Sequence, residues 1–237
     1  MKLLFVNSAL QQKAIAVHDH LCAVYGCPIP YFHSLDPMSE LVSSLLSHRT
    51  KNRASGKAFK QLQASFPTWE AVRDAPTVAV EKAIAPCTWP EQKAPRIQQV
   101  LQLVAERTQG QWSLEFLKDL PVDAARAWLE ALPGVGPKTS AAVLCFSTLR
   151  MRALPVDSHH HRVAQRVGLI SHKVAVGPSH DELAALLPDD WTAQQVYDHH
   201  EVFMLHGQKC CHYRRPECDR CSIQALCKYR QSSPPVD

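Results

Sequence analysis

The sequence predicts an all-α protein. Apolar residues recur at three- and four-residue spacing along most of the 237-residue chain, as they do on the buried face of an amphipathic helix. No segment shows the alternation of apolar and polar residues that is typical of a half-buried strand. Several of the helical segments follow residues that commonly cap helices, such as aspartate, serine and threonine.

The first half of the chain contains three strong helical patterns after a short amphipathic one at 15–25. A proline-rich connector at 27–32 ends the first helix, and Asp36 followed by Pro37 predicts the start of the next. The buried faces of the three patterns are expected to be Leu41, Val42, Leu45 and Leu46; Ala54, Ala58, Phe59, Leu62 and Phe66; and Ile97, Val100, Leu101 and Val104.

Capping residues place the shorter elements. Helices are expected after Thr68 and Thr77, and Ser113 is expected to cap a helix over 114–120. Two pairs have the spacing of a capping box and predict the starts of late helices: Ser179 with Glu182, and Thr192 with Gln195.

Composition is that of an ordinary globular protein, with 46% hydrophobic and 20% charged residues in 26.5 kDa. The net charge of +4 is compatible with nucleic-acid binding. Polar residues break the apolar start of the chain after six residues, and no run has membrane-spanning length. We therefore expect an intracellular monomer without membrane association, cytoplasmic and, if bacterial, associated with the nucleoid. In that setting the nine cysteines favour reduced thiols or a metal site.

A glycine hairpin at 132–136, with sequence LPGVG, joins two helical patterns. Gly134 and Gly136 predict backbone conformations that other residues avoid, with exposed amides for a partner. Pro137 suits the first position of the following helix, and an anion such as a phosphate suits its N-terminus. Lys138 lies in the first turn of that helix, and Asp157 stands at a later turn-to-helix junction.

The residues LPGVGPKT, the apolar helix and PVDSHHHRV together resemble the helix-hairpin-helix and catalytic aspartate of the endonuclease III family of DNA base-excision glycosylases. The resemblance implies that Lys138 is a nucleophile, that Asp157 is essential, and that the amides of Val135 and Gly136 hold a DNA phosphate. From the residues alone, Lys138 could equally be a solvated helix-end lysine and Asp157 an ordinary cap. Such hairpins also serve as passive DNA clamps.

The resemblance also implies an architecture. A six-helix barrel domain with the helix-hairpin-helix is expected at 30–150, and a helical iron-sulfur domain is expected from 1–29 with 151–237. The DNA cleft is expected between them.

Four cysteines near the end of the chain have the spacing of a metal site: Cys211, Cys218, Cys221 and Cys227. Chemistry alone allows tetrahedral zinc or a [4Fe-4S] cluster, whereas the resemblance implies the cluster. Cys210 is outside this pattern, and the remaining cysteines are interpreted as small buried hydrophobic residues: Cys22, Cys27, Cys87 and Cys145.

Basic residues surround this loop. The segment 209–230 carries six cations and two acids, a net charge of +4. With Arg214 and Arg215 at its centre, it is expected to contact phosphates, while a solvated polar loop is the alternative reading. Electron transfer as the main function would leave Lys138 and Asp157 unexplained.

Two further segments resemble the family less closely. Arg49 stands where the family inserts a glutamine into DNA, and Trp89 stands where it uses a smaller apolar wedge. Arginine can stack on or donate to a base, whereas ordinary packing is an equal alternative for Trp89. His159 is expected to face the active site beside Asp157.

The predicted function is that of a DNA glycosylase with abasic-site lyase activity, which removes damaged pyrimidines from duplex DNA. The base must leave the stack to be reached. The amine of Lys138 would attack C1′ and form a Schiff base, for which a helix N-terminus and partial burial favour the neutral amine. Asp157 would stay ionised and stabilise positive charge on the sugar. The alternatives are a monofunctional glycosylase for alkylated or mismatched bases and a non-catalytic DNA-binding clamp.

Overall fold

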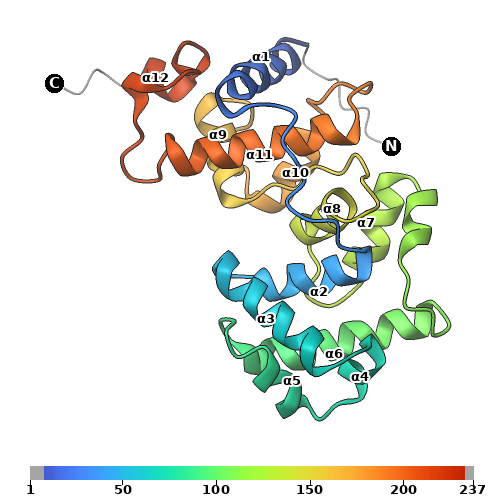
Figure 1. Cartoon of the computed structure of the whole chain (residues 1–237). Helices are drawn as coiled ribbons and strands as arrows, with labels where there is room; N and C mark the ends of the chain where they lie inside the picture. Colours follow the sequence, from blue (N-terminus) through green and yellow to red (C-terminus); the bar gives the residue numbers. More distant parts are fainter. Residues whose placement is uncertain (1–7, 233–237) are drawn as a thin grey trace. The chain divides into compact units, whose positions relative to one another are not determined.

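The computed structural model describes residues 8–232, and over these residues it contains helices and no strand, which confirms the all-α prediction. The chain divides into two compact units (Figure 1). One consists of Met1–Phe32 with Arg152–Asp237, and the other of His33–Met151. No helix of the described residues is long and apolar enough to cross a membrane.

The unit His33–Met151 is built around α2 (Pro37–Ser47), which packs against α8 (Pro137–Phe146), α3 (Asn52–Ser65) and α6 (Pro90–Arg107). Asp36 caps α2 as predicted, since its Oδ1 accepts from the amides of Met38 and Ser39 at 2.9 and 3.0 Å. The apolar faces predicted for α2 and α6 are buried. The remaining elements are α4 (Trp69–Asp74), α5 (Thr77–Ala83), the 3₁₀ helix η1 (Glu115–Asp119) and α7 (Val122–Glu130).

The other unit is organised around α11 (Ala193–Lys209), which packs against α9 (Ser158–Val167) and α1 (Ser8–Tyr25). The capping box of Thr192 with Gln195 begins α11 as predicted. Apolar residues of these helices form one core, which also includes Leu183 and Trp191. The remaining elements are α10 (Val176–Ala184), the 3₁₀ helices η2 (Cys218–Arg220) and η3 (Gln224–Leu226), and α12 (Lys228–Ser232).

Three local predictions for this unit were wrong. Ser179 does not cap a helix, because α10 already begins at Val176 and the buried hydroxyl of Ser179 donates to the Val176 carbonyl at 2.7 Å. Cys22 and Cys27 are not buried free thiols, because they form a disulfide across the turn that ends α1, with Cys27 exposed. The first helix also begins earlier than expected, at Ser8.

A cluster of buried histidines lies where α9 meets α11. His160 stacks on Phe203 with ring centroids 4.6 Å apart, and His199 lies 5.3 Å from His160. Both histidines are almost inaccessible to solvent, and neither ring nitrogen of His160 has a hydrogen-bond partner among the described residues. Burial lowers the pKa of both rings well below the usual value, because a charged imidazolium would lose its hydration.

The fold should therefore lose stability in mild acid. The folded chain keeps both rings neutral, whereas an unfolded histidine takes up a proton below about pH 6.5. As the pH falls from 7.5 to 5.5, we expect each ring to lower the free energy of unfolding by about 1 kcal/mol. Urea denaturation at the two pH values measures this loss. The variant His160→Phe should show a smaller loss than the native chain, and an equal loss in both would contradict the explanation.

Candidate functional site

The hairpin that precedes α8 depends on one glycine. Gly134 has a φ of +81°, and a Cβ on it would come within 2.6 Å of Cδ of Arg96. Gly136 does not need to be glycine for its conformation, because its φ of −109° is open to any residue, so this half of the glycine prediction was wrong. The Val135 amide donates to the Leu132 carbonyl at 3.1 Å. The Gly136 amide has no partner among the described residues and is available to a ligand.

Lys138 lies in the first turn of α8, where the sequence placed it, and its side chain is exposed. The partial burial expected for it is therefore absent. His48 lies nearby, and its Nε2 is 2.9 Å from Oγ1 of Thr139. Burial, followed by the positive charge of Lys138, lowers the pKa of His48 to about 4. The imidazole is neutral at pH 7, so a neutral ring stands beside the lysine, which sequence reasoning did not identify.

Arg49 and Trp89, the two residues predicted to enter DNA, lie together. The guanidinium carbon of Arg49 is 6.0 Å from the centre of the Trp89 ring, and 45% of Trp89 is exposed. Both have a positive φ, +50° and +54°, which is unusual for a residue with a side chain. Because such backbone strain is concentrated at functional positions, the pair is a candidate contact surface, and its entry into DNA stays a prediction.

Lys93 holds the two strained segments together. Its buried ammonium donates to the carbonyls of Leu46 and His48 at 2.7 and 2.8 Å, and to the Thr50 hydroxyl at 2.7 Å. Thr50 in turn accepts from the amide of Thr88, next to Trp89, at 3.2 Å. One side chain of α6 thus fixes the end of α2 and the start of α6, a role that the sequence analysis did not assign to it.

Removing this ammonium should destabilise the unit. The variant Lys93→Met keeps the length of the side chain but leaves three acceptors without their donor. We expect the free energy of unfolding to fall by about 2–3 kcal/mol, measured by urea denaturation. Lys60→Met, at an exposed position of α3, is the matched control and should change little. If Lys93→Met and Lys60→Met lowered the free energy of unfolding equally, Lys93 would not hold the end of α2 and the start of α6 together.

Asp157 caps α9, since its Oδ1 accepts from the His160 amide at 2.7 Å. The carboxyl is partly exposed and can still contact a ligand. Glu201 of α11 is close enough to feel its charge: burial, followed by Asp157 and Asp198, raises the pKa of Glu201 to about 7. Asp157 thus accepts a hydrogen bond from a helix amide and lies near Glu201, whose anionic form is disfavoured by burial.

His159, predicted to face the active site, is held against α11. Its Nδ1 is 3.1 Å from Nη2 of Arg162, which also donates to the Gly207 carbonyl at 2.7 Å. A Cβ at Gly207 would lie 2.8 Å from Cβ of His159, so α11 approaches α9 closely at this point. His159 remains half-buried, and a contact with DNA stays a prediction.

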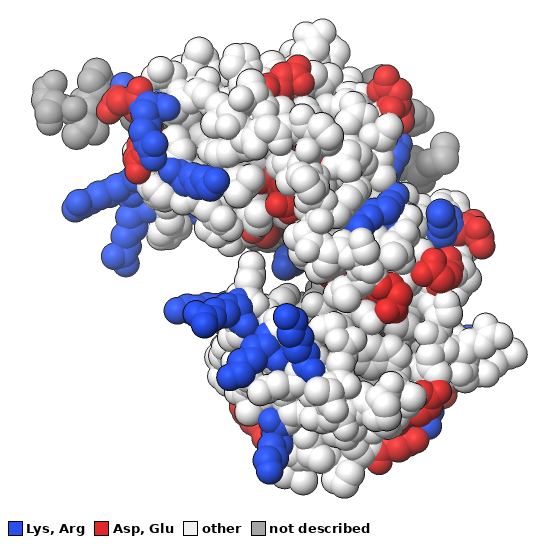
Figure 2. Space-filling view, viewed as in Figure 1, with Lys and Arg blue, Asp and Glu red and all other residues white. Residues whose placement is uncertain are grey.

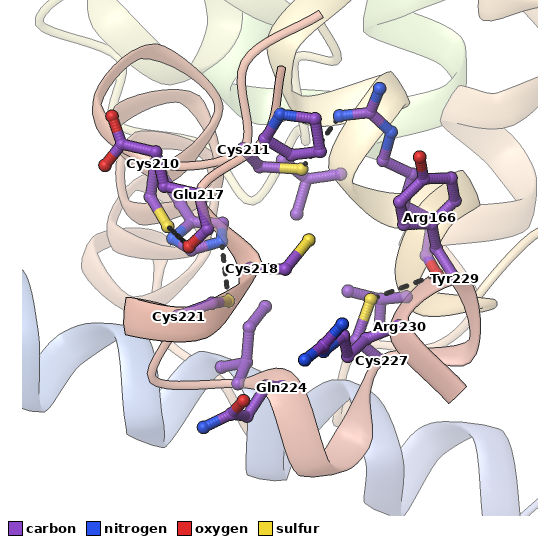
Figure 3. A pocket seen from close by; sticks show the side chains of 15 residues that line it. Arg166, Cys210, Cys211, Glu217, Cys218, Cys221, Gln224, Cys227, Tyr229 and Arg230 are labelled. Atoms are coloured by element: carbon purple, nitrogen blue, oxygen red, sulfur yellow. Dashed lines mark hydrogen bonds between the residues drawn. The ribbon is translucent and has the colours of Figure 1, made fainter. Parts of the chain in front are cut away.

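The predicted metal ligands line one cavity in the loop after α11 (Figure 3). Cys211, Cys218, Cys221 and Cys227 all border it, together with the apolar residues Val163, Val167 and Ile223. Arg166 donates to Sγ of Cys211 at 3.3 Å, and Sγ of Cys227 lies 3.4 Å from the Arg166 carbonyl. Thiols from one short loop, an apolar wall and a donor to sulfur fit a metal–thiolate centre. Cys210 and His206 border the same cavity.

Acidic residues of the segment 209–230 neutralise part of its positive charge. Arg220 pairs with Glu217, and Arg230 pairs with Asp219 at 2.9 Å, so both acids of the segment are engaged. Arg214 and Arg215, the two predicted contact residues, are exposed.

A second basic surface was missed by sequence reasoning. Between Ser47 and Trp69 the chain has no acidic residue, and all five of its basic residues in this stretch are exposed: Arg49, Lys51, Arg53, Lys57 and Lys60. Figure 2 shows Lys and Arg side chains gathered over the part of this unit where α2 ends and α3 begins. The sequence could have indicated this surface, because the stretch from 48 to 68 contains basic residues and no acidic residue to neutralise them.

Comparison with known proteins agrees with this geometry. Residues 42–191 match the HhH-GPD superfamily of base excision DNA repair proteins. Endonuclease III of Escherichia coli strain K12 is 30% identical over 195 residues, which cover 82% of this chain and 85% of that protein. The chain belongs to the endonuclease III family.

Other relatives match over similar lengths. Endonuclease III of Sulfolobus acidocaldarius is 25% identical over 193 residues, 80% of each chain. A protein of Arabidopsis thaliana named as a putative DNA glycosylase is 29% identical over 198 residues, and the match spans 84% of this chain and 66% of that protein.

Solved structures show the same fold. An endonuclease III trapped as a covalent intermediate with DNA has a TM-score of 0.77 at 23% identity, covering 93% of this chain and 97% of that one. A thermostable thymine-DNA glycosylase has a TM-score of 0.76 at 23% identity, covering 95% and 100%. At 23% identity these structures show that the chain shares the endonuclease III fold, and they do not show which reaction it catalyses.

Proposed function

We propose that this member of the endonuclease III family is a bifunctional DNA glycosylase and abasic-site lyase that removes oxidised or otherwise damaged pyrimidines from duplex DNA. The observation that carries the proposal is the position of Lys138: its exposed amine stands in the first turn of α8, directly after a hairpin with an available amide. A non-catalytic clamp would need the hairpin but not a nucleophile there.

The reaction would proceed through the sugar. The neutral amine of Lys138 forms a bond to C1′, and the bond from C1′ to the base breaks, so that the base leaves with the bonding electrons and gains a proton. Loss of the amine proton and ring opening give a Schiff base, from which elimination of the 3′ phosphate nicks the strand. The carboxylate of Asp157 would stabilise the positive charge that develops on the sugar.

The cofactor of the proposal is a [4Fe-4S] cluster bound by Cys211, Cys218, Cys221 and Cys227. Four thiols around one cavity with an apolar wall support it. The cluster would hold the cationic loop in shape, with Arg214 and Arg215 toward phosphates, and needs no redox turnover for this role. The reaction itself would use Lys138 and Asp157 and not the cluster.

The partner of the proposal is duplex DNA that contains a damaged base or an abasic site. The basic surface of residues 49–60 and the exposed arginines of the cysteine loop supply the charge, and Arg49 with Trp89 supplies a contact for the gap that the extruded nucleotide leaves. A monomer in the cytoplasm or nucleoid would meet this substrate.

The basic surface predicts a change in salt dependence. Replacing both Lys57 and Lys60 by glutamine should weaken binding to every duplex and reduce the slope of log K against log salt by up to about 1.8, or about 0.9 for each phosphate that is no longer neutralised. Fluorescence anisotropy at several salt concentrations measures the slope. Lys118→Gln, at an exposed position of η1, is the control and should leave it unchanged. If the double variant kept the native slope of log K against log salt, this basic surface would not contact DNA.

Base release across a panel of duplexes tests the substrate. The proposal predicts release of oxidised pyrimidines followed by strand cleavage. Release of alkylated or mismatched bases without cleavage would support a monofunctional enzyme instead, and binding without any release would support a clamp.

A further inference from the structure

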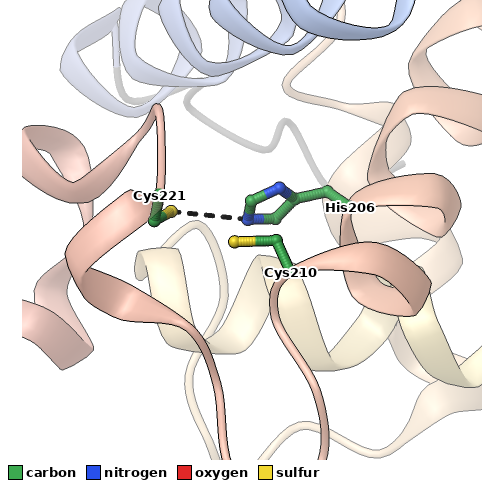
Figure 4. Close-up of side chains that lie close together, drawn as sticks. All are labelled: His206, Cys210 and Cys221. Carbon is green, nitrogen blue, oxygen red and sulfur yellow. Dashed lines mark hydrogen bonds between the residues drawn. The ribbon is translucent and has the colours of Figure 1, made fainter.

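The thiols of the cysteine loop form two groups. Sγ of Cys221 lies beside Sγ of Cys210 and 3.6 Å from Nε2 of His206, whereas Cys211 and Cys227 contact Arg166. The donor atoms of His206, Cys210 and Cys221 all lie within 4.8 Å of one another (Figure 4). Cys210 is the fifth cysteine of the loop and has no place in the four-cysteine spacing.

We propose that His206, Cys210 and Cys221 form a second metal site, which binds Zn²⁺ when the chain lacks the iron-sulfur cluster. Two thiolates and one imidazole are ligands that Zn²⁺ prefers, and water would complete the tetrahedron. With zinc–ligand bonds of about 2.0–2.3 Å, ligand atoms of a tetrahedral site lie about 3.5–3.8 Å apart. The distance of 3.6 Å from Sγ of Cys221 to Nε2 of His206 lies within this range.

The backbone holds the three ligands in place. His206 and Cys210 are four residues apart at the end of α11, so their side chains leave the same side of the helix. The Cys210 carbonyl accepts from the amides of His212 and Glu217 at 2.9 and 3.0 Å, which folds the loop back on the helix end. This return brings Cys221, directly after η2, to the other two ligands.

The imidazole is oriented as in a metal site. The hydroxyl of Tyr25 lies 3.3 Å from Nδ1 of His206, so that Nε2 faces the two thiols. A second hydrogen bond to the ring nitrogen that does not bind the metal is the usual support of a histidine ligand. Binding breaks two S–H bonds, releases two protons and forms two Zn–S bonds, with no change of oxidation state.

The two sites exclude each other, because Cys221 belongs to both. The chain would therefore bind either the iron-sulfur cluster or zinc. Cys210 would be a ligand of zinc only, and Cys218 a ligand of the cluster only. Both are cysteines of the same loop and border the same cavity.

The experiment is metal analysis of the full-length chain and two variants, each produced in zinc-rich medium with limited iron and checked for helix content by circular dichroism. The wild-type chain should contain zinc in the molecules that lack iron. Cys210→Ala should lose at least about tenfold in zinc content and keep its iron, whereas Cys218→Ala should lose its iron and keep up to one zinc. Zinc retained in Cys210→Ala, or lost in Cys218→Ala, would overturn the proposal.

X-ray absorption at the zinc edge of the zinc-containing wild-type chain gives a second readout that does not depend on how the variants fold. We expect two sulfur ligands and one or two nitrogen or oxygen ligands. Four sulfur ligands would place zinc in the cluster site, and a chain without bound zinc would also overturn the proposal. Neither readout requires glycosylase activity, so failure of this inference is distinct from failure of the proposed function.

Discussion

Lys138→Gln is expected to abolish strand cleavage at a damaged pyrimidine, with a loss of on the order of 10³-fold or more in the single-turnover rate. Glutamine keeps the length and polarity of the side chain but has no amine to form the Schiff base. DNA affinity should remain within a few-fold of the native value, because an exposed lysine in the first turn of α8 supplies only one charge to the interface. Rapid-quench assays on an oxidised-pyrimidine duplex, with anisotropy for binding, measure both quantities.

The matched control is Lys118→Gln, which removes an exposed lysine of the same unit and should leave the cleavage rate unchanged. If Lys138→Gln released the base at the native rate and lost only the nick, water would displace the base and Lys138 would act only in the lyase step. If it kept both activities, Lys138 would have no catalytic role.

Asp157→Asn should have the second-largest effect. Asparagine caps a helix about as well as aspartate, so α9 should keep its start and the stability should change by less than about 1 kcal/mol. The charge that stabilises the sugar is lost, and we expect the rate of base release to fall by about 10²–10⁴-fold. A quenched-flow assay of base release, with thermal denaturation alongside, separates the catalytic effect from the structural one.

Asp36→Asn provides the comparison, because Asp36 is also a helix-capping aspartate, at α2. It should affect stability to a similar degree and leave the rate of base release unchanged. Equal losses of rate in the two variants would mean that Asp157 acts through capping, and its assignment as a catalytic group would fail.

Much of the fold could be predicted because its signals are local. Asp36 with Pro37 and Thr192 with Gln195 specify helix starts through contacts within four residues, and the apolar faces of α2 and α6 follow from helical spacing. Ser179 had the same spacing as Thr192 but lies within a helix, since a capping box describes a start only when the residues before it are not helical.

The positions of the candidate residues at helix starts could be predicted from a motif, whereas contacts that depend on packing could not. Lys138 and Asp157 could be named from a motif. The role of Lys93 could not be predicted, because its ammonium donates to acceptors that are more than forty residues away in the chain. Cys210 was set aside for the same reason: only the loop's return onto α11 brings it to Cys221.

Borohydride trapping of the wild-type protein on an oxidised-pyrimidine duplex, with the adduct located by mass spectrometry, tests the central claim most directly. We expect a covalent protein–DNA adduct on a single peptide, attached at Lys138. An adduct at another residue, or none on a duplex that the protein binds and processes, would contradict the assignment of Lys138 as the nucleophile.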